Sequence, residues 1–326
     1  MDRSEIDQRI IEQIKKLESK YEVMGQDLSS YLDGLLYSDY LTYWDYIHLD
    51  TLLSLQSPKT GFKDEFVFIV YHQITELYFK LILWEINQIA EQKHLDEEFF
   101  LERINRVLRY FEQLQHSFAI MREGMETEQF LKFRMALLPS SGFQSAQYRM
   151  IEICSTDLIN LVDVNRREAL ESNNDFDQML ENLYWRSGAT ELASGKKTLT
   201  LRQFEDKYDE DFARKANDYK ERNLLRLFEK HFQSSDKKEE IISSLRELDV
   251  LANISWRLAH YRSAAKYLHK DPKDIKATGG TNWQKYLPPR FQKVIFFPNL
   301  WSEEEKENWG HPALENEVLQ KEKGNL

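Results

Sequence analysis

Residues 65–86, EFVFIVYHQITELYFKLILWEI, constrain the fold more than any other stretch of the chain. They are enough for about six helical turns, and apolar residues on nearly every side are typical of a buried helix. Phe68, His72 and Glu76 lie on one helical face, where His72 and Glu76 interrupt the apolar pattern. Buried polar side chains need partners. The i,i+4 spacing of Glu76 and Lys80 predicts an ion pair, whereas the sequence offers His72 no obvious partner.

The scarcity of helix-breaking residues predicts an all-α protein, because 326 residues include only 11 Gly and 7 Pro. The formal charge is −11, with Lys and Arg interspersed among acids, which argues against binding of nucleic acid. A single cysteine, Cys154, excludes an internal disulfide and a cysteine-based zinc cluster. We expect a cytoplasmic protein, since a lone cysteine suits a reducing compartment and the sequence shows neither a signal core nor an apolar run of about 20 residues.

We find no linker that would divide the chain, and we predict one domain, residues 1–326, built as a single helical bundle. Ile6, Ile10 and Ile14 have helical spacing within residues 4–20. This amphipathic helix packs either on a neighbouring subunit or on its own core, and we expect the arm of residues 1–40 in subunit contacts. Residues 160–235 are highly charged and are interpreted as a solvated insertion of helices and loops.

Two further groups of residues suggest either packing or ligand binding. Tyr43, Tyr46 and Ile47 share one face of a helix or turn, where tyrosines suit a core, an interface or a pocket, with packing the more frequent role. Phe130 and Arg134 lie one helical turn apart in an apolar segment. A buried arginine needs an anion, and the sequence leaves open a carboxylate of the chain or a ligand carboxylate held bidentately.

A second long helix is predicted from Lys237 to Lys270, with Trp256, His260 and Ala264 on one face. An aromatic residue on one side of the histidine and a small residue on the other leave room for a flat cofactor. A single histidine on a helix is nevertheless more often a packed or surface residue. The loop that follows contains residues 278–281, TGGT, whose backbone N–H groups and hydroxyls suit a small polar ligand.

Several chemistries are excluded by the absence of their motifs. The sequence contains no HExxH, GxSxG or P-loop motif. His72 and His260 are too far apart in sequence for the close ligand spacing typical of zinc sites. They are compatible with the two sides of a haem pocket, one histidine ligating iron and the other distal. The residue types alone do not decide whether the two histidines form a haem pocket.

Five blocks resemble the tryptophan 2,3-dioxygenase family, haem enzymes that open the indole ring of L-tryptophan. They are LTYWDYIHLDTLL (41–53), DEFVFIVYHQITELYFKL (64–81), FLKFRMALLPSSGFQSAQYRMIE (130–152), WRLAHYR (256–262) and ATGGT (277–281). They occur in the family's order, and the combination of FIVYHQITEL with PSSGFQSAQYR is specific. The charged residues 160–235 are outside the resemblance.

The resemblance implies a role for each matching residue. His260 corresponds to the axial ligand of haem b iron, Fe2+ in the active state, and His72 to the distal catalytic histidine near the indole N–H. Phe68 and Phe130 correspond to the residues that flank the indole, and Phe130 replaces a tyrosine found in some relatives. Arg134 and Thr278 correspond to the residues that hold the substrate carboxylate. Tyr43, Tyr46 and Ile47 correspond to residues that a neighbouring subunit contributes, in a homotetramer arranged as a dimer of dimers.

The implied reaction is cleavage of the indole C2–C3 bond of L-tryptophan by O2, giving N-formyl-L-kynurenine in the first step of tryptophan catabolism by the kynurenine route. Two alternatives stay open at the level of sequence. One is a haem monooxygenase of the same superfamily that acts on a tryptophan analogue. The other is a non-catalytic helical protein that binds haem or tryptophan.

Overall fold

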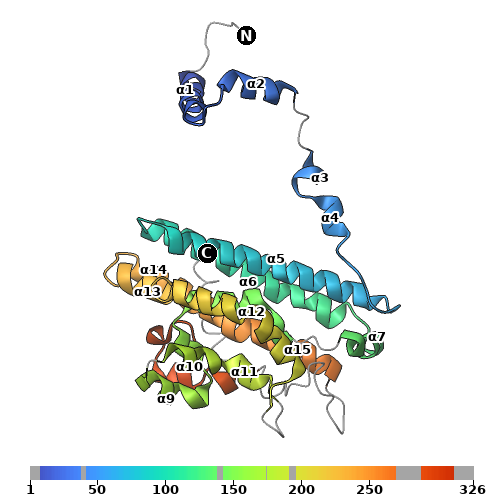
Figure 1. The fold of residues 1–326 in the computed structure, drawn as a ribbon. Helices are drawn as coiled ribbons and strands as arrows, with labels where there is room; N and C mark the ends of the chain where they lie inside the picture. Colours follow the sequence, from blue (N-terminus) through green and yellow to red (C-terminus); the bar gives the residue numbers. More distant parts are fainter. Residues whose placement is uncertain are drawn as a thin grey trace. The chain divides into compact units, whose positions relative to one another are not determined.

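The described chain is all-α, as the sequence predicts. A computed structural model describes residues 8–37, 42–137, 142–173, 175–190, 196–268 and 288–311. Within them no β-strand forms, and only isolated bridges join Val162 to Leu183 and Thr190 to Lys197. Two compact units, residues 1–56 and 57–326, are described separately (Figure 1).

The elements follow one another as short and long helices. The first unit contains α1 (Gln8–Val23), α2 (Leu28–Tyr37), α3 (Tyr43–Tyr46) and α4 (Leu49–Leu53). The second begins with α5 (Asp64–Glu91), α6 (Glu97–Glu123), α7 (Thr127–Phe133), η1 (Arg134–Leu137), η2 (Gly142–Gln144), α8 (Ala146–Ser155), η3 (Leu158–Leu161), α9 (Val164–Asn173), α10 (Phe176–Glu181) and α11 (Tyr184–Gly188). It continues with α12 (Leu199–Tyr219), α13 (Leu224–His231), α14 (Lys238–Val250), the π-helical turn η4 (Leu251–Ser255), α15 (Trp256–Leu268), α17 (Pro289–Gln292), η5 (Pro298–Leu300) and α18 (Glu303–Glu307).

Helix α6 is the centre of the second unit. It begins where the Asp96 carboxylate accepts the Phe99 N–H, a standard N-cap. Its buried stripe includes Phe100, Ile104, Phe111 and other apolar residues at helical spacing. This stripe packs against α5, which runs beside it (Figure 1), and against α14 and α15. Each such buried side chain contributes roughly 1.5–3 kcal/mol.

Helix α5 is longer than predicted and is not buried on nearly every side. It extends to Glu91, and one face buries residues such as Phe79 and Ile82. The opposite face exposes apolar side chains from Phe66 (50% exposed) through Leu77 to Trp84 (63% exposed). Sequence periodicity could not separate these faces, because both are apolar. By length and composition alone α5 also qualifies as a membrane-crossing helix, although core helices of other proteins pass that test and a single such helix is weak support.

The predicted ion pair between Glu76 and Lys80 does not form among the described residues. Instead, the Glu76 carboxylate and its backbone carbonyl each accept a hydrogen bond from Gln147 Nε2, at 2.8 Å. The partner comes from α8, whose position next to α5 the local sequence does not encode. An exposed pair of this kind contributes little to stability, so a tertiary partner readily replaces it.

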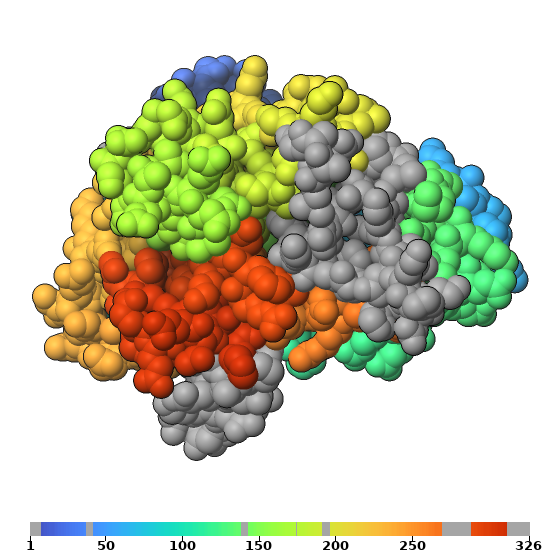
Figure 2. All heavy atoms as spheres, turned by 90° about the horizontal axis from the view of Figure 1, so that it is seen from below, coloured from blue at the N-terminus to red at the C-terminus, as the bar shows by residue number. Residues whose placement is uncertain are grey.

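Residues 160–235 are charged, yet the described part of them is not merely a solvated insertion. Trp185, Phe204 and Phe212 are buried in the largest hydrophobic cluster, while the charges lie mainly on outer faces. Figure 2 shows the beginning of this segment beside residues 288–311 of the C-terminal segment. Gln292 Nε2 donates a hydrogen bond of 3.1 Å to the Asp163 carboxylate across that contact.

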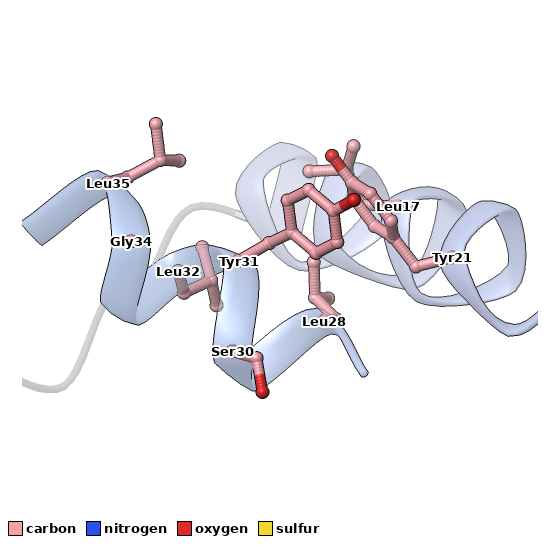
Figure 3. A pocket seen from close by; sticks show the side chains of 8 residues that line it. All are labelled: Leu17, Tyr21, Leu28, Ser30, Tyr31, Leu32, Gly34 and Leu35. Carbon is pink, nitrogen blue, oxygen red and sulfur yellow. The ribbon is translucent and has the colours of Figure 1, made fainter. Parts of the chain in front are cut away.

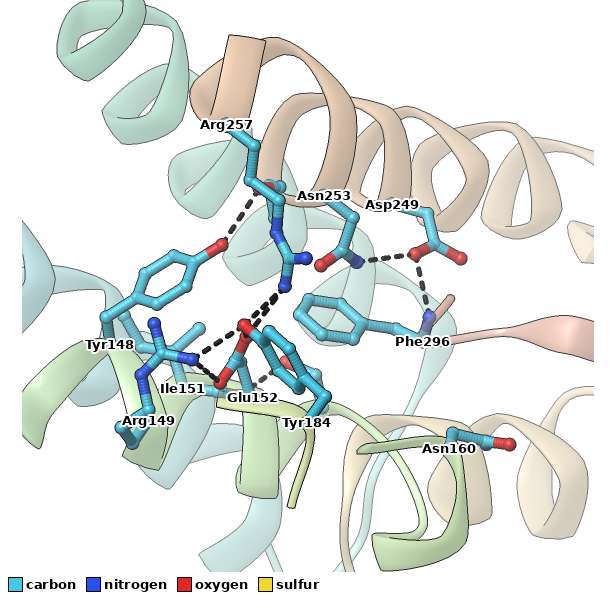
Figure 4. Close-up of polar contacts among 12 residues, drawn as sticks. Tyr148, Arg149, Ile151, Glu152, Asn160, Tyr184, Asp249, Asn253, Arg257 and Phe296 are labelled. Atoms are coloured by element: carbon cyan, nitrogen blue, oxygen red, sulfur yellow. Dashed lines mark hydrogen bonds and ion pairs between the residues drawn. The ribbon is translucent and has the colours of Figure 1, made fainter. Parts of the chain in front are cut away.

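A buried cluster around Glu152 connects α8 to α11 and α15 (Figure 4). Glu152 is 1% exposed and accepts hydrogen bonds from Arg149 (2.8 Å), Arg257 (3.1 Å) and the Tyr184 hydroxyl. Burial alone would lower the pKa of Arg257, but the oxygens of Tyr184, Tyr148 and Glu152 outweigh it and raise the pKa. The guanidinium therefore stays charged, and the carboxylate is the counterion that its burial requires.

The N-terminal unit leaves its apolar side chains exposed. Helix α1 overlaps the predicted range, residues 4–20, but extends to Val23. It contains no buried residue, and Ile10 and Leu17 are 49% and 38% exposed. A groove of about 490 Å³ lies between α1 and α2 (Figure 3), where the rings of Tyr21 and Tyr31 stack at 4.1 Å. Isolated helices of this length are marginal in water, so this unit requires a surface to pack against.

Glu152→Gln tests the buried cluster. The amide keeps the volume of the side chain but leaves two buried guanidinium groups, those of Arg149 and Arg257, without their carboxylate. We expect the free energy of unfolding to fall by about 3 kcal/mol, measured by urea denaturation. Glu128→Gln, at an exposed pair with Lys132, is the control and should leave stability almost unchanged. A loss below about 1 kcal/mol for Glu152→Gln would show that the charge is dispensable.

Candidate functional site

His72 lies on α5 with one ring nitrogen fixed by its own helix. Its Nδ1 is 2.7 Å from the Phe68 carbonyl oxygen, one turn earlier. A carbonyl only accepts, so Nδ1 must carry the proton, and Nε2 then presents its lone pair. The Phe68 ring lies against the imidazole, with centroids 4.0 Å apart. The site can therefore accept a hydrogen bond at Nε2 beside an aromatic surface.

The His72 side chain is exposed in the described structure. Neighbouring protein atoms nevertheless lower the pKa of its imidazole. Desolvation by that protein is the largest cause and outweighs the opposing effects of the Phe68 carbonyl and Glu76. The imidazole is therefore neutral near pH 7.

His260 lies on α15 in the first turns after the π-helical turn. Desolvation lowers its pKa to about 4, and repulsion from His72 and Arg149 adds to this effect. His72 therefore contributes to the electrostatic environment of His260. A neutral His260 at pH 7 retains a lone pair for a metal.

Aromatic rings connect the two histidines through α6. Phe118 stacks on His260, with centroids 6.1 Å apart and planes inclined by 22°. Phe118 also contacts Tyr71 at 5.9 Å, and Tyr71 meets His72 edge-on at 5.7 Å. The local sequence does not distinguish Phe118 and Tyr71 from core residues, because nothing local separates a site-lining ring from a core ring.

Phe130 comes from α7 and joins the same cluster. Its ring centroid is 6.3 Å from that of Phe68 and 4.5 Å from that of Tyr267 on α15. The structure thus gathers Phe68, His72, Phe130 and His260 at one place, although they come from three helices.

Arg134 follows α7 at the start of η1 and is 6% exposed. Burial lowers the pKa of its guanidinium, which still remains far above neutral pH. Phe133, the residue before it, contacts Phe68 at a centroid distance of 5.8 Å. Arg134 therefore directly follows the helix that carries Phe130, at the edge of the aromatic cluster.

The other predicted residues lie either outside the described residues or in the N-terminal unit, which is described by itself. Thr278 lies outside the described residues, as do residues 269 and 270 at the end of the predicted second long helix. Tyr43 and Tyr46 form the ends of α3 in the N-terminal unit and are 70% and 72% exposed. Ile47 follows them as the C-cap and is half-buried.

The donor set fits haem better than a metal held by side chains alone. Among the described residues, no group of three or more His, Cys, Asp and Glu side chains is placed to hold a metal ion. Haem iron needs only an axial ligand from the protein, because the porphyrin supplies four nitrogens. A neutral imidazole beside apolar rings, as at His260, fits that requirement.

Comparison with known proteins points to one family. The model of the family described as tryptophan 2,3-dioxygenase matches residues 34–268. A tryptophan 2,3-dioxygenase of Polaromonas naphthalenivorans is 30% identical over 280 residues, covering 81% of this chain and 91% of the relative. One from Bacillus thuringiensis subsp. konkukian is 28% identical over 278 residues, covering 82% and 92%.

Other relatives have a higher sequence identity, but over a shorter part of the chain. A tryptophan 2,3-dioxygenase of Ruegeria sp. is 44% identical over 118 residues, and the chain spans only 42% of that relative's length. The family model nevertheless covers well over half of this chain, and the Polaromonas relative aligns over most of both proteins. The chain belongs to the tryptophan 2,3-dioxygenase family.

Proposed function

We propose that the protein is a haem-dependent dioxygenase that cleaves the indole C2–C3 bond of L-tryptophan with O2 to give N-formyl-L-kynurenine, the first step of tryptophan catabolism. One observation carries this proposal: the rings of Phe118 and Tyr71 connect two neutral imidazoles, His72 and His260, within one aromatic cluster. His260 has a lone pair for iron, and His72 has a lone pair for an N–H donor. Family membership supports the same reaction.

In this proposal His260 would hold the iron of haem b. Its neutral ring needs no deprotonation before it ligates iron, and the nearly parallel Phe118 ring restricts its rotation. When bound, the haem supplies ferrous iron, which activates O2 for addition across the C2–C3 bond.

His72 orients the substrate and does not remove its proton. The Nδ1–H bond to the Phe68 carbonyl leaves Nε2 as an acceptor for the indole N–H. The indole N–H is a very weak acid, and the lowered pKa of His72 makes the imidazole a weaker base than usual. Its contribution is therefore the geometry of the indole relative to the oxygen that adds to it.

Phe68 and Phe130 form the apolar walls for the indole, since both rings belong to the cluster beside His72. Arg134 holds the substrate carboxylate in a charge-assisted pair. Phe130 has no hydroxyl to add a contact, so Arg134, with Thr278 as its partner in this role, carries the recognition of the carboxylate.

The working enzyme is a homotetramer, a dimer of dimers, in which the N-terminal segment of one subunit completes the site of another. The exposed apolar residues of α1, the exposed stripe of α5, and the exposed rings of Tyr43 and Tyr46 support this arrangement. Exposed groups of large apolar side chains like these are uncommon on the surface of a monomer. Tyr43, Tyr46 and Ile47 are the residues that would close the partner's site.

His260→Ala should remove the iron ligand and with it tightly held haem. We expect a purified variant without a stoichiometric Soret band, whereas the wild type shows a Soret band that shifts when L-tryptophan is added. His231→Ala, at an exposed histidine on α13, is the control and should keep the wild-type spectrum. A normal haem spectrum in His260→Ala would contradict the ligand assignment.

Arg134→Ala and His72→Ala should separate binding from orientation. Loss of the guanidinium leaves the substrate carboxylate unpaired, so KM should rise by roughly 30-fold or more, the equivalent of about 2 kcal/mol. His72→Ala should lower kcat more modestly, because orientation is only part of the barrier. Steady-state kinetics with L-tryptophan measures both.

Lys132→Ala, which removes an exposed cation from the same helix as Phe130, is the control and should change neither constant. An unchanged KM in Arg134→Ala would show that the carboxylate binds elsewhere. Complete loss of turnover in His72→Ala would indicate base catalysis.

Mixed tetramers test the shared site. Protomers with Arg134→Ala and protomers with both Tyr43→Ala and Tyr46→Ala should each be poorly active. After they are mixed and allowed to exchange subunits, some sites will combine an intact Arg134 with intact tyrosines from a partner. We expect part of the wild-type activity to return and light scattering to show four protomers. No recovery in proven mixed tetramers would show that each site is built from one chain.

A further inference from the structure

The helix that carries His260 is interrupted by the π-helical turn η4, which is fully buried. The Trp256 N–H bonds the Leu251 carbonyl, five residues back, where an α-helix would use Ala252. The wider turn contains an additional residue, so the face that α15 presents is rotated by roughly 100° relative to an uninterrupted helix. The π turn therefore determines whether His260 or a neighbouring residue faces the aromatic cluster.

The Ala252 carbonyl that Trp256 bypasses receives a hydrogen bond from another helix. Tyr148 on α8 donates its hydroxyl to this oxygen at 2.9 Å. Tyr148 is 4% exposed, and burial raises the pKa of its phenol, so the hydroxyl remains a donor at neutral pH. Its ring packs on Phe79 of α5, which in turn contacts Trp256 edge-on.

The spacing on the two helices is matched. Tyr148 and Glu152 lie four residues apart on α8 and so share a face. Their partners, Ala252 and Arg257, lie five residues apart, which is the repeat of a π turn. Figure 4 shows Tyr148, Glu152 and Arg257 together with Asn253 of the π turn, whose amide donates a hydrogen bond of 2.8 Å to Asp249 at the end of α14.

We propose that Tyr148 is a positioning residue, whose hydroxyl bond to the Ala252 carbonyl holds the π turn in the register that aims His260 at the site. The role of His260 in this inference rests on the proposed function, whereas the role of Tyr148 in the register does not.

Tyr148→Phe removes the hydroxyl and keeps the ring. Tyr219→Phe is the matched control, because it removes a buried hydroxyl on α12 that bonds Asn87 and not the π turn. Hydrogen exchange of the amides of residues 251–268, in protein without haem, is the first readout. We expect exchange about tenfold faster there in Tyr148→Phe alone, since a buried carbonyl loses its partner. Equal exchange in the two variants would overturn the role of Tyr148.

The second readout is the iron–histidine stretching band of the ferrous haem protein in resonance Raman spectra. A merely structural loss of stability would leave this band in place. We expect it to shift or broaden in Tyr148→Phe, with a haem dissociation constant raised about tenfold, and to match the wild type in Tyr219→Phe. An unchanged band in Tyr148→Phe would overturn the link to His260. A wild type that binds no haem would contradict the proposed function, while the exchange result still decides the role of Tyr148.

Discussion

The packing of α6 against both α5 and α15 is the constraint on which the candidate site depends. Phe118, near the end of α6, contacts His260 directly and reaches His72 through Tyr71. The same packing desolvates both imidazoles and keeps them neutral. A charged His260 would be a poor ligand for iron, so the core that holds the helices together also prepares the chemistry.

The buried polar cluster of α8 has a different task from that of the apolar core. Apolar packing places α15 beside α6 but tolerates some rotation about the helix axis. Directional bonds from Tyr148 to Ala252 and from Arg257 to Glu152 define that rotation. A buried ion pair adds little net stability compared with an apolar replacement. The geometry of this pair instead supports a role in fixing how α15 is rotated against α8. In the proposed tetramer, the exposed apolar side chains of the N-terminal unit and of α5 would be buried between subunits.

The sequence predicted much of this arrangement, and its failures have physical causes. Helical periodicity identified the long helices and placed Phe68 with His72, because those relations are local. The expectation of a haem iron came from the resemblance to a family and not from the spacing of residues. Sequence did not reveal the exposed face of α5, since an apolar pattern does not say which chain will cover it. It also missed the π turn, because the partner that stabilises it, Tyr148, is 104 residues away from Ala252.

The fate of the two oxygen atoms tests the central claim most directly. The reconstituted ferrous protein would react with L-tryptophan under isotopically labelled O2 for a single turnover, and mass spectrometry would count the label in the product. A dioxygenase that holds the indole between Phe68, Phe130 and His72 predicts N-formyl-L-kynurenine with both atoms labelled. A product with one labelled atom would contradict the account and identify a monooxygenase, and an absence of product from the haem-loaded protein would identify a binding protein.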